Sequence, residues 1–391
     1  MYHNTKVYLS MILFCAVVTY WSKAPYPVWV FLVLYLLLFG ILEYGDVFPG
    51  WKIWSQQERT SECYDWFSHY LKKDYGMVDD KLVYDLSESL YNNDYAASSE
   101  QALLNKYNLM FKSLNLSKGK RLLDCGCGVG IWMEFCKQRG VEVVGLTLSQ
   151  EQHKVLTEKG LTAYVHDYRV LDRQFIHQFD AITLFGSTEH VTVCSSFDAL
   201  DKDAYRDYSA LFKVLNQYLK PEGTLLVTVL VQGKPFVKRS GFYDRLQCYV
   251  LSRHYGGYYT TVPILSKAIT DNGFVIDSIQ DYTRDYHWIS VREPDHFGHW
   301  WIHWDEDPLD KVGYFIKGLF TDPFLIHHWL YYGLDTWMWH LGGYQKTPLT
   351  DEQVHEATSN LKYILVHKPK VKSVSNVSGS MTERPSSFFS S

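Results

Sequence analysis

The sequence lacks any long run of basic residues, and its charge balance is slightly acidic. It carries 38 Lys and Arg against 43 Asp and Glu, which gives a formal net charge of −5 and a pI near 6.3. Proteins that bind nucleic acid need clustered cations to neutralise phosphates. The composition therefore gives no reason to expect a nucleic-acid partner.

Cysteine is also scarce. The seven copies are an odd number without a regular spacing, which argues against a disulfide framework and for a reducing compartment. Cys125 and Cys127 form a C-x-C pair, but a structural zinc site needs four ligands and no second pair stands nearby. Residues 296–344 are rich in His, Trp and Tyr, yet their spacing matches no metal motif. We therefore predict no metal site.

The first 45 residues hold two apolar runs without a charge, Val7–Trp21 and Pro27–Leu42. Each is near the lower end of the roughly 20 residues that a membrane helix needs. Trp and Tyr stand at their edges, as interface anchors do. We expect a transmembrane hairpin here. A cleaved signal peptide, or a hairpin that dips into the bilayer without crossing it, is the alternative.

The stretch Arg121–Gly130, RLLDCGCGVG, reads as a short buried strand that runs into a glycine-rich turn. Residues 131–139 have helical composition, and 141–149 form a second apolar strand ending in a polar turn. A strand, a glycine turn, a helix and a strand form a βαβ unit, the usual seat of nucleotide binding in doubly wound sheets. A short glycine motif can also be a loop without a ligand, so its context has to decide.

The rest of the central region continues the alternation of strands and helices. This pattern predicts an α/β fold, a doubly wound parallel sheet with helices on both faces. The predicted strands are 163–166, 179–185, 224–231 and 274–279, with a last edge strand at 360–368, and the predicted helices are 100–114, 150–159, 204–219 and 262–272.

The G-x-G-x-G spacing, with Asp124 ahead of it, is typical of S-adenosylmethionine-dependent methyltransferases. The segment Val144–Gln152, VGLTLSQEQ, resembles the cyclopropane fatty acid synthase family, which includes the mycolic acid cyclopropane synthases. Four further pieces resemble family motifs in the same order. They are Tyr84–Ser87 (YDLS), Asp167–Arg169 (DYR), Gly186–Val191 (GSTEHV) and the late Tyr286.

This resemblance implies a class I methyltransferase (Rossmann-like) sheet with S-adenosylmethionine as its cofactor. It also implies that Glu189 is a general base or orients one, with Tyr286 beside it. The alternative for Glu189 is a structural carboxylate that caps its own loop, and for Tyr84 an ordinary buried tyrosine. The cofactor-binding residues implied are Tyr84, Asp124, Gly126, Gly128, Gly130, Thr147, Leu148, Gln152, Asp167 and Tyr168.

Members of this family hold a bicarbonate with a cysteine amide, a glutamate, a histidine and a tyrosine. Here Glu189 and Tyr286 match, but Val227 stands at the histidine position and no cysteine follows the YDLS motif. His254 and His287 are conceivable substitutes. The resemblance therefore favours simple methylation of carbon over cyclopropanation.

We expect methyl transfer to a hydrophobic acceptor, with the acyl or sphingoid chain of a membrane lipid as the first choice. The order of segments is similar to that of the fungal sphingolipid C9-methyltransferases. A sterol, a headgroup amine or another small molecule is the alternative acceptor, and a catalytically dead cofactor-binding protein is the alternative class. Since S-adenosylmethionine is made in the cytosol, we expect an integral membrane protein, of an endomembrane or the plasma membrane, whose catalytic domain faces the cytosol.

These inferences divide the chain into five parts. They are a membrane hairpin (1–45), a linker and helical cap (46–116), the methyltransferase domain (117–290), an aromatic-rich C-terminal extension (291–369) and a disordered tail (370–391).

Overall fold

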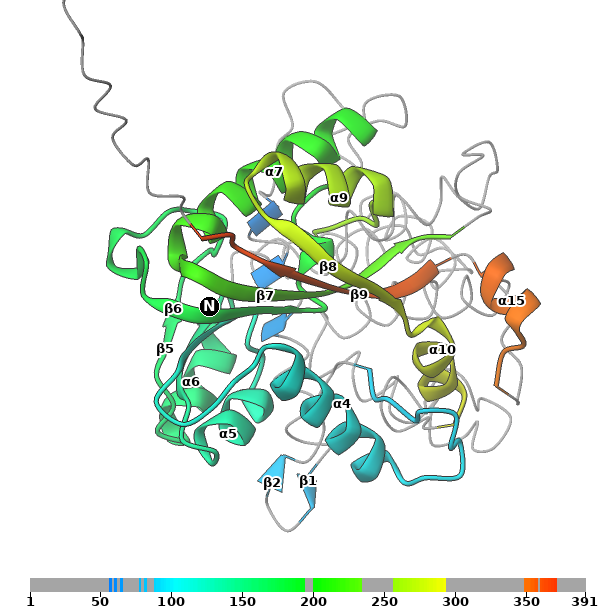
Figure 1. The fold of residues 1–391 in the computed structure, drawn as a ribbon. Coiled ribbons are helices and arrows are strands. Elements are labelled where there is room, and N and C mark those ends of the chain that lie inside the picture. The colour runs from blue at the N-terminus through cyan, green and yellow to red at the C-terminus, as the bar shows by residue number, and fades with distance from the viewer. Residues whose placement is uncertain are drawn as a thin grey trace, which may run out of the picture.

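A computed structural model describes residues 56–57, 60–61, 64–65, 77–78, 81–82, 88–193, 200–233, 256–292, 348–357 and 359–370. One sheet of seven strands, in the order β5-β4-β3-β6-β7-β9-β8, forms the centre of the molecule (Figure 1). A separate two-stranded sheet pairs β1 (Met77–Val78) with β2 (Lys81–Leu82). The seven strands are β3 (Arg121–Cys125), β4 (Glu142–Thr147), β5 (Ala163–Val165), β6 (Phe179–Phe185), β7 (Leu219–Gln232), β8 (Val275–Asp281) and β9 (Ser359–His367).

Five of these strands, β3 to β7, run parallel to one another. The inner ones are apolar on both sides, as strands covered on two faces must be. In β3, Leu122 and Leu123 point to opposite faces and both are fully buried. The strands and helices predicted between residues 122 and 279 are present, with their ends shifted by a few residues.

Helices cover both faces of the sheet, and each face has its own core (Figure 1). On one face α7 (Leu200–Tyr218) and α9 (Val262–Asp271) pack against β-strand residues such as Leu184 and Val227. On the other face α4 (Ser99–Ser113) and α5 (Ile131–Lys137) pack against Leu122 and Leu226. The remaining elements are α6 (Gln150–Glu158), α10 (Thr283–Arg292), α15 (Asp351–Glu356), η2 (Arg173–Phe175) and η3 (Thr188–His190).

The prediction of a parallel sheet with a last edge strand was wrong in one respect. β9 is not at an edge but lies between β7 and β8, antiparallel to both, so the sheet is mixed. The reason is visible in β9 itself. Ile364 belongs to one core and Tyr363 to the other, so both faces of the strand are apolar and need cover. The edge strand on this side of the sheet is β8, where Val275 and Ile279 are exposed.

The predicted localisation, integral in a membrane, is corrected. Within the part of the chain that the structure describes, no helix is both long enough and apolar enough to cross a membrane. The longest, α7, carries charges such as Asp203 and Arg206 along its length. The hairpin predicted over 1–45, the aromatic-rich segment 296–344 and the tail from 371 on lie outside the described residues.

We expect Ile364→Ala to lower the free energy of unfolding by about 2–5 kcal/mol, because it empties a fully buried site in an interior strand. Val275→Ala, at an exposed position of the edge strand, is the control and should change it by less than about 0.5 kcal/mol. Urea unfolding followed by circular dichroism measures both. Equal losses in the two variants would contradict the interior position of β9.

Candidate active site

The candidate site lies at the carboxyl ends of the parallel strands. From β3 the chain continues to β4 and β5 on one side, whereas β6 and β7 continue on the other. The strand order therefore reverses between β3 and β6, and a crevice at such a reversal is where open α/β sheets bind ligands. The loops after β3, β4, β5 and β6 all start at this edge of the sheet, and they carry most of the predicted site residues.

The three glycines after β3 have positive φ angles but different surroundings. A Cβ on Gly126 would lie 2.5 Å from the Cβ of Ser187, and one on Gly130 would lie 2.5 Å from Cδ2 of Leu156. At Gly128, with φ of +55°, no described atom lies within 4 Å of that position. Only Gly128 thus leaves room for a close ligand, whereas Gly126 and Gly130 allow the turn to pack against the protein.

Asp124, at the end of β3, is buried at 2 % exposure, and its Oδ1 accepts a hydrogen bond of 2.9 Å from Oγ1 of Thr183 on β6. This contact joins the two strands that flank the crevice. Cys125 and Cys127 lie on either side of Gly126, and burial raises the pKa of both thiols well above the usual range. Both therefore stay protonated at neutral pH.

The turn after β4 is held by its own side chains. Thr147 Oγ1 donates to Gln152 Oε1 at 2.7 Å, and Ser149 caps α6 by accepting from the Gln152 amide at 3.0 Å. Ser149 in turn donates to Asp65 at 2.5 Å, and the carbonyl of Leu148 accepts from Ser61 at 2.9 Å. The polar groups predicted to bind the cofactor here thus also fix the turn, and a segment before the domain covers it.

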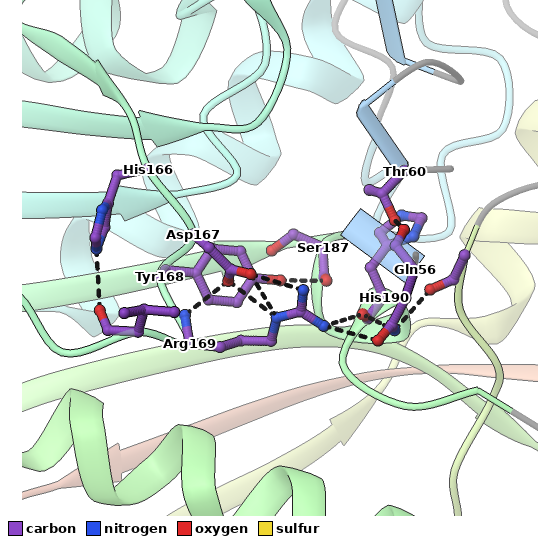
Figure 2. Close-up of polar contacts among 10 residues, drawn as sticks. Gln56, Thr60, His166, Asp167, Tyr168, Arg169, Ser187 and His190 are labelled. Carbon is purple, nitrogen blue, oxygen red and sulfur yellow. Dashed lines mark hydrogen bonds and ion pairs between the residues drawn. The ribbon is translucent and has the colours of Figure 1, made fainter. Parts of the chain in front are cut away.

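After β5, Asp167 and Arg169 form a two-pronged ion pair (Figure 2). Burial would raise the pKa of Asp167, but the hydrogen bonds and charge of Arg169 outweigh it and hold that pKa below its usual value. Between them Tyr168, 8 % exposed, donates to the Ser187 carbonyl at 2.6 Å. The loops after β5 and β6 are therefore bonded to each other.

Glu189 lies in η3, on the loop after β6, and is only 8 % exposed. Its Oε1 accepts from the Leu230 amide at 2.6 Å, and its Oε2 has no hydrogen-bond partner among the described residues. Burial raises the pKa of Glu189 to about 7 despite the bond from Leu230, and the charge of Glu88 adds to the rise. Such a carboxyl can take up or release a proton near neutral pH.

Buried hydroxyls without a partner in the described part of the chain also occur at Thr188, Thr192 and Thr260. Buried polar atoms in proteins are nearly always hydrogen-bonded, to water or ligand where the protein offers nothing. The segment 256–260 packs closely against η3, and the Tyr258 amide donates to the Glu189 carbonyl at 2.8 Å. The carboxyl end of β7 thus adjoins a buried polar region in which some groups bond to one another, whereas Glu189 Oε2 and these three hydroxyls find no partner among the described residues.

The remaining residues considered for the site lie on α10 and β7 or outside the described residues. Tyr286, half-buried on α10, packs against the core of the α4 and α5 face. Val227, at the motif position of the family's histidine, is fully buried in the core of the α7 and α9 face. His287 Nε2 lies 3.2 Å from the Ser359 carbonyl, and burial lowers its pKa. Tyr84 and His254 are outside the described residues.

Several site residues escaped prediction. Gln56, Tyr64 and Asp65 contact the loops after β4 and β6, although they lie far away in sequence. Glu88 accepts from Tyr363 at 2.5 Å, and both side chains are buried. No local pattern marks these positions; only the position of Glu88, next to the YDLS motif, could have drawn attention to it.

The fold and the loops at its carboxyl edge are those of a class I methyltransferase. The family model for mycolic acid cyclopropane synthetase matches residues 55–293. Because this match covers more than half of the chain, the protein belongs to that family. The family predicted from the sequence motifs is therefore confirmed.

Two curated relatives match over shorter stretches. A probable fatty acid methyltransferase of Mycobacterium tuberculosis is 38 % identical over 138 residues, which are 33 % of this chain and 29 % of the relative. The cyclopropane-fatty-acyl-phospholipid synthase of Escherichia coli is 34 % identical over 146 residues, 36 % of this chain and 33 % of the relative. The matched stretch thus spans about a third of each relative.

Among solved structures, the cyclopropane synthase MmaA2 from Mycobacterium tuberculosis superposes with a TM-score of 0.57 at 17 % identity, covering 81 % of this chain and all of the other. The mycolic acid cyclopropane synthase CmaA1, complexed with SAH and CTAB, gives the same TM-score and identity and covers 80 % of this chain and 99 % of the other. At this identity the likeness shows the fold alone.

Substitutions in the glycine turn should separate packing from ligand binding. Gly130→Ala should lower the free energy of unfolding by about 2–4 kcal/mol, because it combines a left-handed φ with contacts to Leu156 and Leu161. Gly128→Ala should cost only about 1–2 kcal/mol of backbone strain and should instead weaken binding of S-adenosylhomocysteine. Urea unfolding measures the stability of both variants, and calorimetric titration measures their binding of the ligand. A larger stability loss in Gly128→Ala, or a larger binding loss in Gly130→Ala, would contradict the roles given to the two glycines.

The raised pKa of Glu189 predicts a dependence of stability on pH. Because its pKa in the folded protein, about 7, lies above the ordinary value of 4.5, the protonated carboxyl favours folding at low pH and this contribution is lost as pH rises through 7. Between pH 4.5 and 8, the free energy of unfolding of wild type should fall by about 3 kcal/mol more than that of Glu189→Gln. Urea unfolding of both proteins at several pH values in this range measures the difference. If the free energies of unfolding of the two proteins changed in parallel with pH, the Glu189 carboxyl would be solvated and the prediction would be wrong.

Proposed function

We propose that this protein transfers a methyl group from S-adenosylmethionine to a carbon atom of a hydrophobic acceptor, the acyl or sphingoid chain of a lipid. The observation that carries the proposal is Glu189. It is a buried carboxyl with one oxygen lacking a partner in the described structure and a pKa near 7. It lies in η3, three residues beyond Gly186, on the loop that follows β6, and β6 is the strand next to the one that leads into the glycine turn.

The cofactor assignment is supported by the turn after β3. Gly128 leaves space for a close backbone approach, and Gly130 is the N-cap of α5, which begins at Ile131. Asp124, Thr147, Leu148, Asp167 and Tyr168 lie at or just after the ends of three neighbouring strands, and Gln152 lies in the first turn of α6, so all six belong to one edge of the sheet. The structure of CmaA1 was determined with SAH.

When bound, the cofactor supplies an electrophilic methyl group on a sulfonium. The protein's part is to align a nucleophilic carbon with it, exclude water and accept the proton that the methylated carbon must lose. Glu189 is suited to the last task because its Oε2 is not engaged by another described residue, whereas the Leu230 amide fixes Oε1. Its pKa near 7 lets it take that proton and release it again at neutral pH.

A hydrophobic acceptor is supported by the aromatic side chains near the end of β6. Phe185, the last residue of that strand, contacts Trp132 within the apolar core of the α4 and α5 face. The relatives named above include a probable fatty acid methyltransferase and a cyclopropane-fatty-acyl-phospholipid synthase, whose names point to acyl chains. Aromatic faces also stabilise a cationic carbon. Methylation without ring closure is favoured because Val227 stands at the motif position of a bicarbonate-binding histidine and no cysteine follows the YDLS motif.

Lipid analysis of cells that express the protein and are grown on deuterated methyl-methionine tests this function. We expect label in the chain fraction that survives hydrolysis of the headgroup, as a methyl branch with all three deuteriums retained. Retention of two deuteriums would mean a ring or methylene product, and label released with the headgroup would mean an amine acceptor. Absence of labelled lipid would overturn the proposal.

Substitution of the carboxyl should remove turnover without removing the cofactor. We expect Glu189→Gln to lower the rate of methyl transfer by about 10²–10⁴, the usual contribution of a general base, while the protein still binds S-adenosylhomocysteine. Glu142→Gln, at an exposed position on the amino end of β4, is the matched control and should keep the rate of wild type. An unchanged rate in Glu189→Gln would exclude Glu189 as the base.

A further inference from the structure

Arg169 occupies the middle of a polar network that joins the loop after β5 to the loop carrying Glu189 (Figure 2). Its Nε and Nη2 donate to the carboxylate of Asp167, at 2.9 and 2.7 Å to Oδ1 and Oδ2. Its remaining nitrogen, Nη1, donates to Oε1 of Gln56 at 3.0 Å and to the carbonyl of His190 at 3.2 Å. One planar group thus connects an acidic side chain of the cofactor site with the residue that follows Glu189.

The geometry of a guanidinium makes this connection directional. Because its nitrogens are held in one rigid fork, a side chain that binds Asp167 through two of them fixes where the third points. A lysine in the same place would keep the positive charge beside Asp167 but would have one nitrogen in place of three. It could not hold both oxygens of Asp167 and reach His190 at once.

Gln56 extends the connection and has its orientation set by Arg169. Since its Oε1 accepts from Arg169, its Nε2 is the donor, and it donates to the carbonyls of His190 at 2.6 Å and Gly256 at 2.7 Å. Gly256 lies close to this segment, because a Cβ there would be 2.5 Å from Thr60 Oγ1. The network therefore binds the segment 256–260 as well as the loop after β6.

These contacts fix the main chain at Glu189 and at the residue that follows it. The His190 carbonyl accepts from Arg169 and Gln56, the Glu189 carbonyl accepts from the Tyr258 amide, and Leu230 holds the carboxyl itself. His190 is further held by Tyr64, whose hydroxyl lies 2.7 Å from Nε2. A shift of Asp167 would thus be transmitted to the backbone of the proposed base.

We infer that Arg169 is a positioning residue that couples occupancy of the cofactor site at Asp167 to the placement of Glu189. The inference rests on the proposed function, which puts the cofactor against Asp167. Arg169 does not touch the reacting atoms. It holds Asp167 for the cofactor and, through Gln56 and His190, holds the loop of the base in the position that the bound cofactor requires.

Hydrogen–deuterium exchange with S-adenosylhomocysteine alone tests the coupling without any acceptor. In wild type we expect the ligand to slow exchange of the amides at 187–193 about fivefold or more, the low end of usual coupling between sites. In Arg169→Lys the ligand should still bind, with a dissociation constant changed by about threefold or less, yet leave exchange at 187–193 nearly unaltered.

Two further variants keep the test decisive. Gln56→Ala leaves the Arg169–Asp167 pair intact and should also lose the protection, even if Arg169→Lys fails to fold. Arg121→Lys is the matched control: this arginine donates to Gln178 and stacks on Phe179 at the amino end of β3, so the protection should remain.

Full protection at 187–193 in both Arg169→Lys and Gln56→Ala would overturn the inference, as would equal loss in Arg121→Lys. Failure of wild type to bind S-adenosylhomocysteine at all would instead overturn the proposed function and the inference with it.

Discussion

The burial of one carboxyl is the constraint on which the rest of the site depends. A carboxylate taken out of water is costly unless it is paired, and among the described residues the carboxyl of Glu189 has no cationic partner; its Oε1 accepts from the Leu230 amide and its Oε2 from no other side chain or backbone group. The remaining cost appears as its raised pKa. The surrounding structure must therefore hold the loop of Glu189 in place. Tyr258, Arg169 and Gln56 do so through backbone carbonyls, which leaves the side chain itself available for chemistry.

The same constraint gives β9 a role beyond completing the sheet. The amide that holds Glu189 belongs to Leu230 of β7, and Leu230 pairs with Leu361 of β9. Two residues further along β9, Tyr363 pairs with Thr228 of β7, and its hydroxyl donates to the buried side chain of Glu88. The charge of Glu88 in turn contributes to the raised pKa of Glu189. A strand distant in sequence thus shapes both the support and the electrostatic surroundings of the proposed base.

Much of the fold was predictable from the sequence because its signals are local. Apolar runs such as 179–185 and the glycine turn after β3 specify their own structure, and the family motifs placed Glu189 and Asp167 at the same edge. What could not be predicted depends on contacts across the chain. The place of β9 between β7 and β8 follows from apolar residues on both its faces, which a short run does not distinguish from an edge strand. Gln56, Glu88 and the bridging nitrogen of Arg169 act through partners far away in sequence.

The interior position of β9 also has a consequence for the order in which the chain can fold. β8 pairs only with β9 within the described sheet, and β7 presents one side to β9 along its whole length from Thr224 to Gln232. Until residues 359–367 arrive, β7 remains an open edge with unpaired backbone groups, and β8 has no strand to join. Formation of contacts between such distant segments is slow. The nucleotide-binding half, β3 to β6, can therefore assemble from local contacts first, whereas the half that supports Glu189 is completed last.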